Sequence, residues 1–185
     1  MKLINTEISG CYEVICAASQ DARGAFVKTF HQPSFEALGL RCDWQEEYYS
    51  VSAENVIRGM HFQIPPHSHA KLVYCLQGEA LDVLIDLRRG SPSYGSIASL
   101  TLSPEKANSI YIPSGVAHGF LSLKDNTVMQ YKVTSVYSAQ HDAGILWSSL
   151  NFNWPVERPV ISARDQIHLS FKDFESPFEF LVDKS

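Results

Sequence analysis

The feature that most limits how this chain can fold is a succession of short apolar runs, each ended within a few residues by glycine or proline. Short runs rich in β-branched and aromatic side chains are typical of β-strands. Strands are predicted at residues 14–19, 25–30, 44–52, 56–63, 71–76, 80–87, 97–102, 109–112, 118–123 and 127–136. Many short strands between turns favour an all-β sandwich or jelly roll. We expect one such domain over residues 1–185, because this length suits a single hydrophobic core.

Helical signals are confined to the two ends of the chain. Residues 34–40 predict a short helix, and residues 161–169 or the tail contain a second. The four cysteines, none in a CxxC spacing, predict reduced and partly buried thiols.

Charge and hydropathy exclude several classes of partner. The net charge of −5 gives no basic footprint for nucleic acid. No apolar run approaches the roughly 20 residues that span a bilayer, so no membrane partner is expected. The first residues lack the apolar core of a signal peptide, which favours a cytoplasmic protein.

The stretch from Arg58 to Gly78, RGMHFQIPPHSHAKLVYCLQG, predicts a hairpin around Pro65-Pro66, and residues 118–136 predict another around 124–126. Strict alternation along 56–63 would point Arg58 and His61 to opposite faces. Gly59 lies between them, and a glycine inside a strand often marks a bulge. We therefore predict a bulge that brings Arg58 and His61 into one cavity.

Several polar groups have two interpretations. His61, between apolar neighbours, is either a core histidine or a reactive group; Arg58 and Lys71 either extend to solvent or converge on an anion. Tyr131 is either a core ring or a proton donor, and Asp165 either caps a helix or partners a histidine. A basic imidazole, an oxyanion site and an acid on the opposite face together suit inversion of a carbon beside a ketone.

Several ordered motifs resemble the dTDP-4-dehydrorhamnose 3,5-epimerase family: DARGAF, the stretch above continued to Gly95, IPSGVAHGFLSL, YKVTSVYSAQHDAGILW and WPVERPVISARD. The resemblance covers about Asp21 to Asp165. It implies a cupin-type jelly roll, usually a homodimer, that acts on a nucleotide-diphospho-4-keto-6-deoxy sugar in deoxysugar biosynthesis. It implies no metal, no nicotinamide and no other cofactor.

The resemblance also implies residue roles. His61 would remove the proton beside the ketone, with Asp165 as its partner. Lys71 would stabilise the enolate oxygen, and Tyr131 would be the acid on the opposite face. The residues that it implies for substrate binding are Arg58, His118, Tyr137, Arg23, Phe26, Gln63, Glu46 and Tyr48, of which Arg23 and Phe26 would act on the neighbouring subunit's site.

This chain departs from the family where the nucleotide is expected. Lys28 stands where an acidic residue is usual, and residues 46–50 read EEYYS instead of the usual Gln-Asp-Asn-His-Ser type. These changes leave the nucleotide open to CDP or GDP in place of dTDP, and leave inversion at C3, C5 or both, including C5 alone on a 3,6-dideoxy sugar.

Two other functions remain to be weighed. A metal-dependent cupin, either a dioxygenase or an isomerase, would use His67, His69 and His118, although Val73 and Tyr74 stand where such sites usually add a glutamate. A non-catalytic sugar-nucleotide binder on the same fold would not need His61, Lys71, Tyr131 and Asp165 together.

Overall fold

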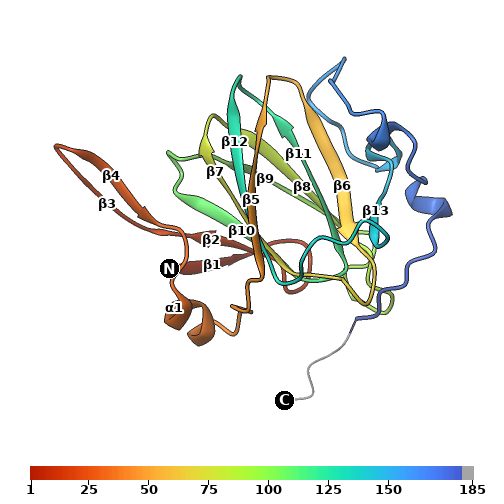
Figure 1. The fold of residues 1–185 in the computed structure, drawn as a ribbon, viewed down its shortest axis with the longest axis horizontal. Helices are drawn as coiled ribbons and strands as arrows, with labels where there is room; N and C mark the ends of the chain where they lie inside the picture. The colour runs from red at the N-terminus through yellow and green to blue at the C-terminus, as the bar shows by residue number, and fades with distance from the viewer. Residues whose placement is uncertain (181–185) are drawn as a thin grey trace.

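The computed structural model describes residues 1–180, which form two packed antiparallel sheets (Figure 1). The six-stranded sheet has the order β1 (Lys2–Asn5), β2 (Tyr12–Ile15), β10 (Asn108–Ile112), β7 (Lys71–Gln77), β12 (Thr127–Val133) and β5 (Glu46–Ser52). The five-stranded sheet has the order β13 (Asp142–Gly144), β6 (Ile57–Gln63), β11 (Val116–Ser122), β8 (Ala80–Asp86) and β9 (Ile97–Leu102). The predicted all-β, cupin-type jelly roll is confirmed; the last five residues of the predicted domain lie outside the described residues.

Neither predicted hairpin forms. β6 lies in the five-stranded sheet and β7 in the six-stranded sheet, so the segment around Pro65-Pro66 crosses between the two sheets. β11 and β12 are separated in the same way. The hairpin predictions were wrong because a local alternation of apolar residues marks a strand but does not say with which strand it pairs. The crossings place β6 and β7 face to face, and this arrangement builds the site.

Three apolar clusters hold the layers together. The inner cluster lies between the sheets and contains Val73, Leu84 and Phe120. A second covers the outer face of the five-stranded sheet, where Met60 and Phe62 pack against the C-terminal segment that carries Trp154. The third covers the outer face of the six-stranded sheet and includes residues around the short helix. Because both sheets are covered on both faces, strands such as β10 and β11 are buried along their whole length, without the alternation of a half-exposed strand.

Most predicted strands agree with the structure within a few residues, but the N-terminal region differs. The predicted strand at 14–19 is divided between β2 and β3 (Ala17–Asp21), because Cys16 donates to the Ala107 carbonyl and the chain then leaves the sheet. β1 and β13 were not predicted, since each is very short. The helices are α1 (Gln32–Ala37), which lies slightly earlier than predicted, and the 3-10 turns η1 (Trp147–Ser149), η2 (Arg164–Gln166) and η3 (Phe171–Asp173).

Strands β3 and β4 (Gly24–Lys28) form a two-stranded arm that projects from the body (Figure 1). All five side chains of β3 are exposed, and so is most of β4. Phe26, at its centre, is 66% exposed.

Within residues 1–180, the structure contains no helix that is both long and apolar enough to cross a membrane. The four cysteines are free thiols, and three of them are buried, as predicted.

Candidate active site

The site begins with an irregularity in β6. His61 pairs with His118 and Arg58 pairs with Phe120, so three steps on β6 oppose two steps on β11. The extra residue is the predicted bulge at Gly59. Gly59 has φ +143°, and a Cβ there would lie 2.5 Å from the Gly119 Cα, so only glycine lets the two strands approach this closely. Beyond the bulge, alternation resumes with His61 facing inward.

As predicted, Arg58 and His61 share one cavity. It has a volume of about 210 Å³ and is lined by residues of both sheets, including Lys71, His118 and Tyr131. Ile57, Met60 and Phe62 instead pack on the outer face of the same sheet. The bulge therefore turns residues three apart toward the same space.

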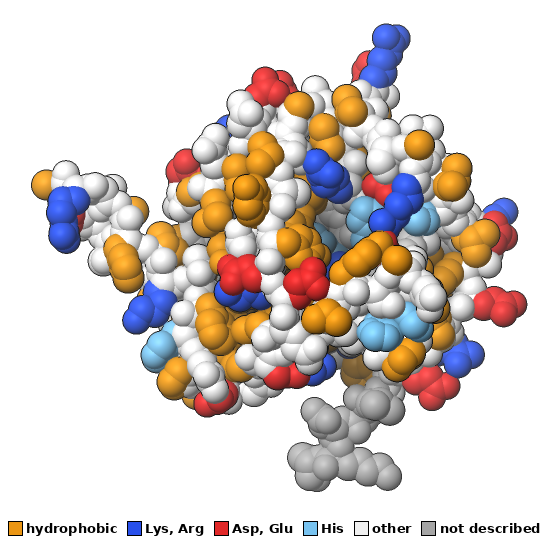
Figure 2. All heavy atoms as spheres, in the orientation of Figure 1, with side chains coloured by type: hydrophobic (Ala, Val, Ile, Leu, Met, Phe, Trp, Pro, Cys, Tyr) orange, Lys and Arg blue, Asp and Glu red, His pale blue; other side chains and the backbone are white. Residues whose placement is uncertain are grey.

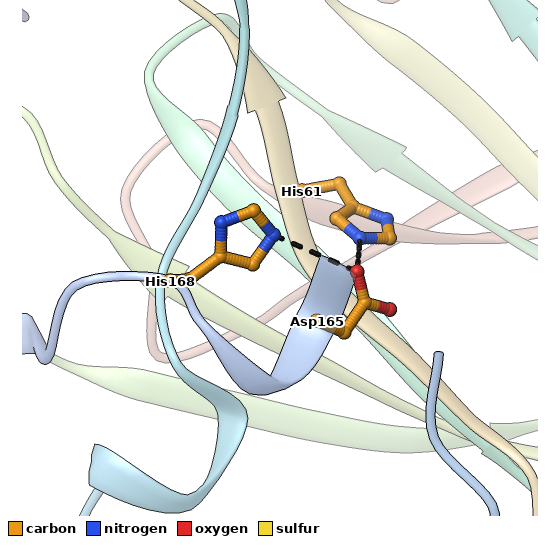
Figure 3. A group of neighbouring side chains, drawn as sticks. All are labelled: His61, Asp165 and His168. Carbon is orange, nitrogen blue, oxygen red and sulfur yellow. Dashed lines mark hydrogen bonds and ion pairs between the residues drawn. The ribbon is translucent and has the colours of Figure 1, made fainter. Parts of the chain in front are cut away.

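His61 forms a close pair with Asp165 of η2 (Figure 3). The His61 Nε2 lies 2.7 Å from the Asp165 Oδ1, and the Asp165 Oδ2 accepts a bond of 3.3 Å from the Gly59 backbone N–H. Burial raises the pKa of Asp165, but the His61 contact, the Gly59 N–H and Arg164 outweigh it and hold that pKa below its usual value. An ionised Asp165 only accepts, so the His61 Nε2 carries the proton and Nδ1 keeps a free lone pair.

Burial also acts on the imidazole. It lowers the pKa of His61, and the Asp165 carboxylate offsets this lowering only in part. A neutral, oriented imidazole at physiological pH is what a general base requires.

Lys71 enters the site from the opposite sheet. It begins β7, its side chain is almost fully buried, and its Nζ donates a bond of 3.1 Å to the His61 backbone carbonyl. Burial lowers the pKa of Lys71 to about 8, with Asp142 and Asp82 acting in the other direction. The ammonium is therefore charged at neutral pH and poorly solvated, so that an anion in the cavity would be strongly attracted.

Tyr131 lies across the cavity from His61. It sits on β12 of the six-stranded sheet, whereas His61 sits on β6 of the other sheet, and both line the same space. Its phenol is within 3.5 Å of the Ser50 Oγ, and its ring stacks on Tyr48 at 4.9 Å. Burial raises the pKa of Tyr131, so the phenol keeps its proton. The cavity thus has an imidazole on one wall and a protonated phenol on the other.

A second histidine–aspartate pair closes the base of this cavity. The His118 Nε2 lies 2.8 Å from the Asp82 Oδ1, and both side chains are buried. The His118 ring also meets the edge of Tyr131 at 6.0 Å. His118 therefore lies where the resemblance places it, in the wall of the pocket.

An adjoining hollow of about 310 Å³ extends outward and is lined by Glu46, Gln63, Tyr137 and Arg164, among others. Figure 2 shows basic, acidic and histidine side chains gathered around a depression on this face. Glu46 accepts from the Tyr137 backbone N–H, and the Tyr137 hydroxyl donates to Asp142. The two hollows share Tyr48, His61 and Lys71.

Gln63 lines the outer hollow but has little free hydrogen-bonding capacity. Its amide nitrogen contacts the carbonyls of His67 and Val136 and the ring of His69, and its oxygen accepts from the Ser138 N–H. This side chain, only 3% exposed, ties two loops together beside the hollow.

The arginines and Phe26 are placed differently from one another. Arg58 lines the inner cavity, where it donates to Ser52 and to the Val51 carbonyl. Arg23 lies on the exposed arm and pairs with Asp21, and Phe26 lies on the same arm. Within the described chain, neither Arg23 nor Phe26 lines the two hollows.

The three histidines considered for a metal do not converge. The His67 ring lies tilted against the His141 ring, His69 contacts Gln63, and His118 is bonded to Asp82. Among residues 1–180, the histidine, cysteine and acidic side chains whose ligand atoms gather within 4.8 Å are His61, Asp165 and His168.

The sequence analysis missed several residues at the site, among them Ser50, Asp82, Asp142, Arg164 and His168. Arg164 holds Asp142 with two bonds of 2.6 Å and 3.1 Å. Asp142, Arg164 and His168 lie in short or irregular segments whose position no periodic pattern predicts. The adjacency of Arg164 to Asp165 was the available signal for one of them.

Comparison with known proteins identifies the family. The sequence model described as dTDP-4-dehydrorhamnose 3,5-epimerase matches residues 5–173. The dTDP-4-dehydrorhamnose 3,5-epimerase of Shigella flexneri is 39% identical over 168 residues, which cover 89% of this chain and 93% of that protein.

Solved structures agree as well. The dTDP-4-dehydrorhamnose 3,5-epimerase of Bacillus anthracis, with TDP and PPi bound, superimposes with a TM-score of 0.88 at 35% identity, covering 91% of this chain and 98% of that one. The dTDP-6-deoxy-D-glucose-3,5-epimerase of Legionella pneumophila, in complex with dTDP-4-keto-L-rhamnose, gives a TM-score of 0.92 at 29% identity, covering 98% and 99%. A match of this extent, in sequence and in fold, places the chain in the dTDP-4-dehydrorhamnose 3,5-epimerase family.

Proposed function

We propose that this protein is an epimerase that inverts C3 and/or C5 of a nucleotide-diphospho-4-keto-6-deoxyhexose in deoxysugar biosynthesis. The observation that carries the proposal is the cavity between the sheets, with His61 on one wall and Tyr131 on the other. Epimerisation beside a ketone needs a base and an acid on opposite faces of the sugar ring, and the two-sheet arrangement supplies that opposition.

The first step is removal of the proton next to the ketone. The free Nδ1 of His61 takes that proton, the C–H electron pair becomes the enolate C=C bond, and the C4 carbonyl electrons move onto oxygen. Asp165, bonded to Nε2, balances the imidazolium that forms. The neutral resting imidazole and the ionised carboxylate support these roles.

The enolate oxygen requires a cation or hydrogen-bond donors. Lys71, charged at neutral pH and buried between the sheets, stabilises that oxygen in our proposal, and His118 contributes a second polar contact from the pocket wall.

The second step returns a proton from the other face. The enolate carbon takes the proton of the Tyr131 phenol, the C4 carbonyl re-forms, and the configuration at that carbon is inverted. The Tyr131 phenolate then takes up a proton and the His61 imidazolium releases one, through solvent, which resets the site. The burial of Tyr131 supports a phenol that is protonated before the reaction begins.

The nucleotide end is assigned to the outer hollow, to Arg58 in the lining of the inner cavity, and to the arm. Arg58 contacts the diphosphate, Tyr137, Gln63, Glu46 and Tyr48 shape the pocket, and Arg23 and Phe26 reach it from the second copy of a homodimer. The exposure of the arm on an isolated chain supports this arrangement. Because Tyr48, one of the changed residues, stacks on Tyr131, the changes in this stretch bear on the sugar end as well as on the nucleobase.

The proposal is tested by incubating the protein in heavy water with 4-keto-6-deoxyglucose linked to dTDP, CDP, GDP or UDP. The named relatives make dTDP the first of these to examine. We expect deuterium at C3, C5 or both, and the labelled positions and preferred nucleotide define the product. If none of the four sugars takes up deuterium at C3 or C5, the proposed function is contradicted.

Two variants separate the steps. His61→Ala and His61→Asn should abolish exchange, whereas Tyr131→Phe should still exchange the proton but lose most inversion. Exchange at the wild-type rate in His61→Ala would overturn the assignment of the base. A protein-free control with the same sugar in heavy water identifies spontaneous exchange.

A further inference from the structure

Asp165 is approached by two imidazoles. The His61 Nε2 lies 2.7 Å from the Asp165 Oδ1, and the His168 Nε2 lies 3.5 Å from the same oxygen (Figure 3). The two histidine rings meet edge to face with centroids 6.0 Å apart. His168 comes three residues after Asp165, and neither the sequence patterns nor the proposed mechanism gives it a role.

The His168 Nε2 is buried and has no hydrogen-bond partner among residues 1–180. A buried, unpartnered ring nitrogen is costly, and Asp165 is the acceptor that it faces. The flanking Ile167 and Leu169 side chains are exposed, so it is the histidine of this segment that turns inward.

The backbone holds His168 in this place. Leu146 donates to the Leu169 carbonyl at 2.8 Å, which fixes the residue after His168 to the segment that follows β13. Gly144 of β13 pairs with His61 of β6. A Cβ on Gly144 would lie 2.6 Å from the His168 Nε2 and 2.8 Å from its Cε1, so glycine at this position makes room for the ring.

We propose that His168 is a positioning residue: its Nε2–H donates to the Asp165 Oδ1 and keeps that oxygen on the His61 ring, so that the His61 Nδ1 stays directed at the substrate. With Gly59 N–H on Oδ2, this contact leaves the carboxylate no freedom to rotate. The inference rests on the proposed function.

A metal site is the competing use of these three side chains. Ligands on a tetrahedral zinc at about 2.0–2.1 Å lie roughly 3.4 Å apart. The His61–Asp165 separation of 2.7 Å is shorter than this and matches a hydrogen bond. The geometry therefore favours proton-mediated contacts.

The test compares His168→Gln, which keeps an N–H donor, with His168→Phe and His168→Met, which remove it. We expect the phenylalanine and methionine variants to lower kcat about 10-fold to 100-fold while KM changes less than about two-fold, and glutamine to restore most of the rate. Gly144→Ala, which displaces the ring without altering it, should lower kcat as His168→Phe does. His31→Phe, which removes an exposed imidazole on the arm-proximal helix cap, should leave kcat unchanged.

A second readout does not depend on turnover. NMR of ring-labelled histidine should show the His61 proton on Nε2 in the wild type and in His168→Gln, and a mixture of tautomers in His168→Phe. If the wild type exchanges no sugar proton, the proposed function fails but this measurement still decides the role of His168. Wild-type kcat and an unchanged His61 tautomer in folded His168→Phe would overturn the inference, as would stoichiometric zinc binding that His168→Gln abolishes.

Discussion

Burial lowers the pKa values of both His61 and Lys71. The pKa of His61 falls below 6.5 and that of Lys71 falls to about 8. Between these values the base is neutral and the lysine is charged, which is the combination that proton removal and enolate stabilisation require. The same desolvation thus prepares one group to accept a proton and the other to attract an anion.

A bell-shaped pH dependence of kcat/KM should follow. Activity is lost toward acid as His61 becomes protonated, so the acid limb should lie below pH 6.5. Activity is lost toward alkali as Lys71 loses its charge, near pH 8. Steady-state rates over this range check the prediction. An alkaline limb that stays in place in an active Lys71→Arg variant would assign it to another group.

Replacing Lys71 with an apolar residue should stabilise the fold and remove the activity. A lysine whose folded pKa is about 8 against 10.5 in the unfolded chain opposes folding at neutral pH, and this cost fades as pH rises from 8 to 10.5. Lys71→Met should therefore raise the free energy of unfolding at pH 7 by about 1–2 kcal/mol and abolish epimerisation. Urea unfolding at pH 7 and at about pH 10 measures this, and the gain over wild type should be smaller at the higher pH. Equal stability of the two proteins at pH 7 would argue that Lys71 is well solvated.

The bulge in β6 determines which way its side chains face. Without it, Arg58 and His61 would lie on opposite sides of the sheet, and one of them would leave the cavity. The close approach of Gly59 to Gly119 of β11 makes the bulge possible. A strand irregularity of one residue thus decides whether Arg58 and His61 line the same cavity.

Gly59→Ala should be strongly destabilising. A new Cβ would lie 2.5 Å from the Gly119 Cα on a backbone at φ +143°, so the cost should be about 3 kcal/mol or more in urea unfolding. Gly24→Ala is the matched control, because Gly24 also has positive φ but has nothing within 4 Å of its Cβ position. The control should lose only about 1 kcal/mol, and similar losses in both variants would show that the contact with Gly119 is unimportant.

The sequence allowed the strands, the bulge and most of the pocket residues to be predicted, because these depend on local pattern or on recognised motifs. The pairing of strands could not be predicted: β6 and β7 alternate like a hairpin, yet they lie in opposing sheets. His168 and Arg164 lie in irregular segments, and their proximity to His61 or Asp142 exists only after the chain has folded. Arg23 and Phe26 lie outside the pocket of their own chain, so their use depends on a second copy.

In our proposal the site of a single chain is incomplete, because the projecting arm reaches the site of the partner instead. Each site would take Arg23 and Phe26 from its partner, as the exposed arm suggests. Mixing Arg23→Ala with His61→Ala should then restore activity, because a mixed dimer has one site with both an intact arm and an intact base. Random pairing should give about a quarter of the wild-type sites. Absence of recovery, with mixed dimers demonstrated by sizing of tagged chains, would place Arg23 in its own chain's site.

Acid should destabilise the fold through His69, whose ring is partly buried. Burial lowers the pKa of His69 to about 3, with Lys71 acting in the same direction. The unfolded chain takes up a proton below pH 6.5 that the folded chain refuses, so the free energy of unfolding should fall as pH drops from 6.5 toward 3. His69→Gln should flatten this slope, whereas the exposed His31→Gln should keep it. Urea unfolding across the interval provides the measurement, and an unchanged slope in His69→Gln would show that its ring protonates freely in the folded state.

His61 and Asp165 are separated by 104 positions along the chain, yet their side chains are in contact. Closing so long a loop is entropically expensive and tends to slow folding. During synthesis, His61 therefore lacks its contact with Asp165 until most of the polypeptide has left the ribosome. Enzymatic activity should therefore appear late in folding, and its appearance would report that the fold is complete.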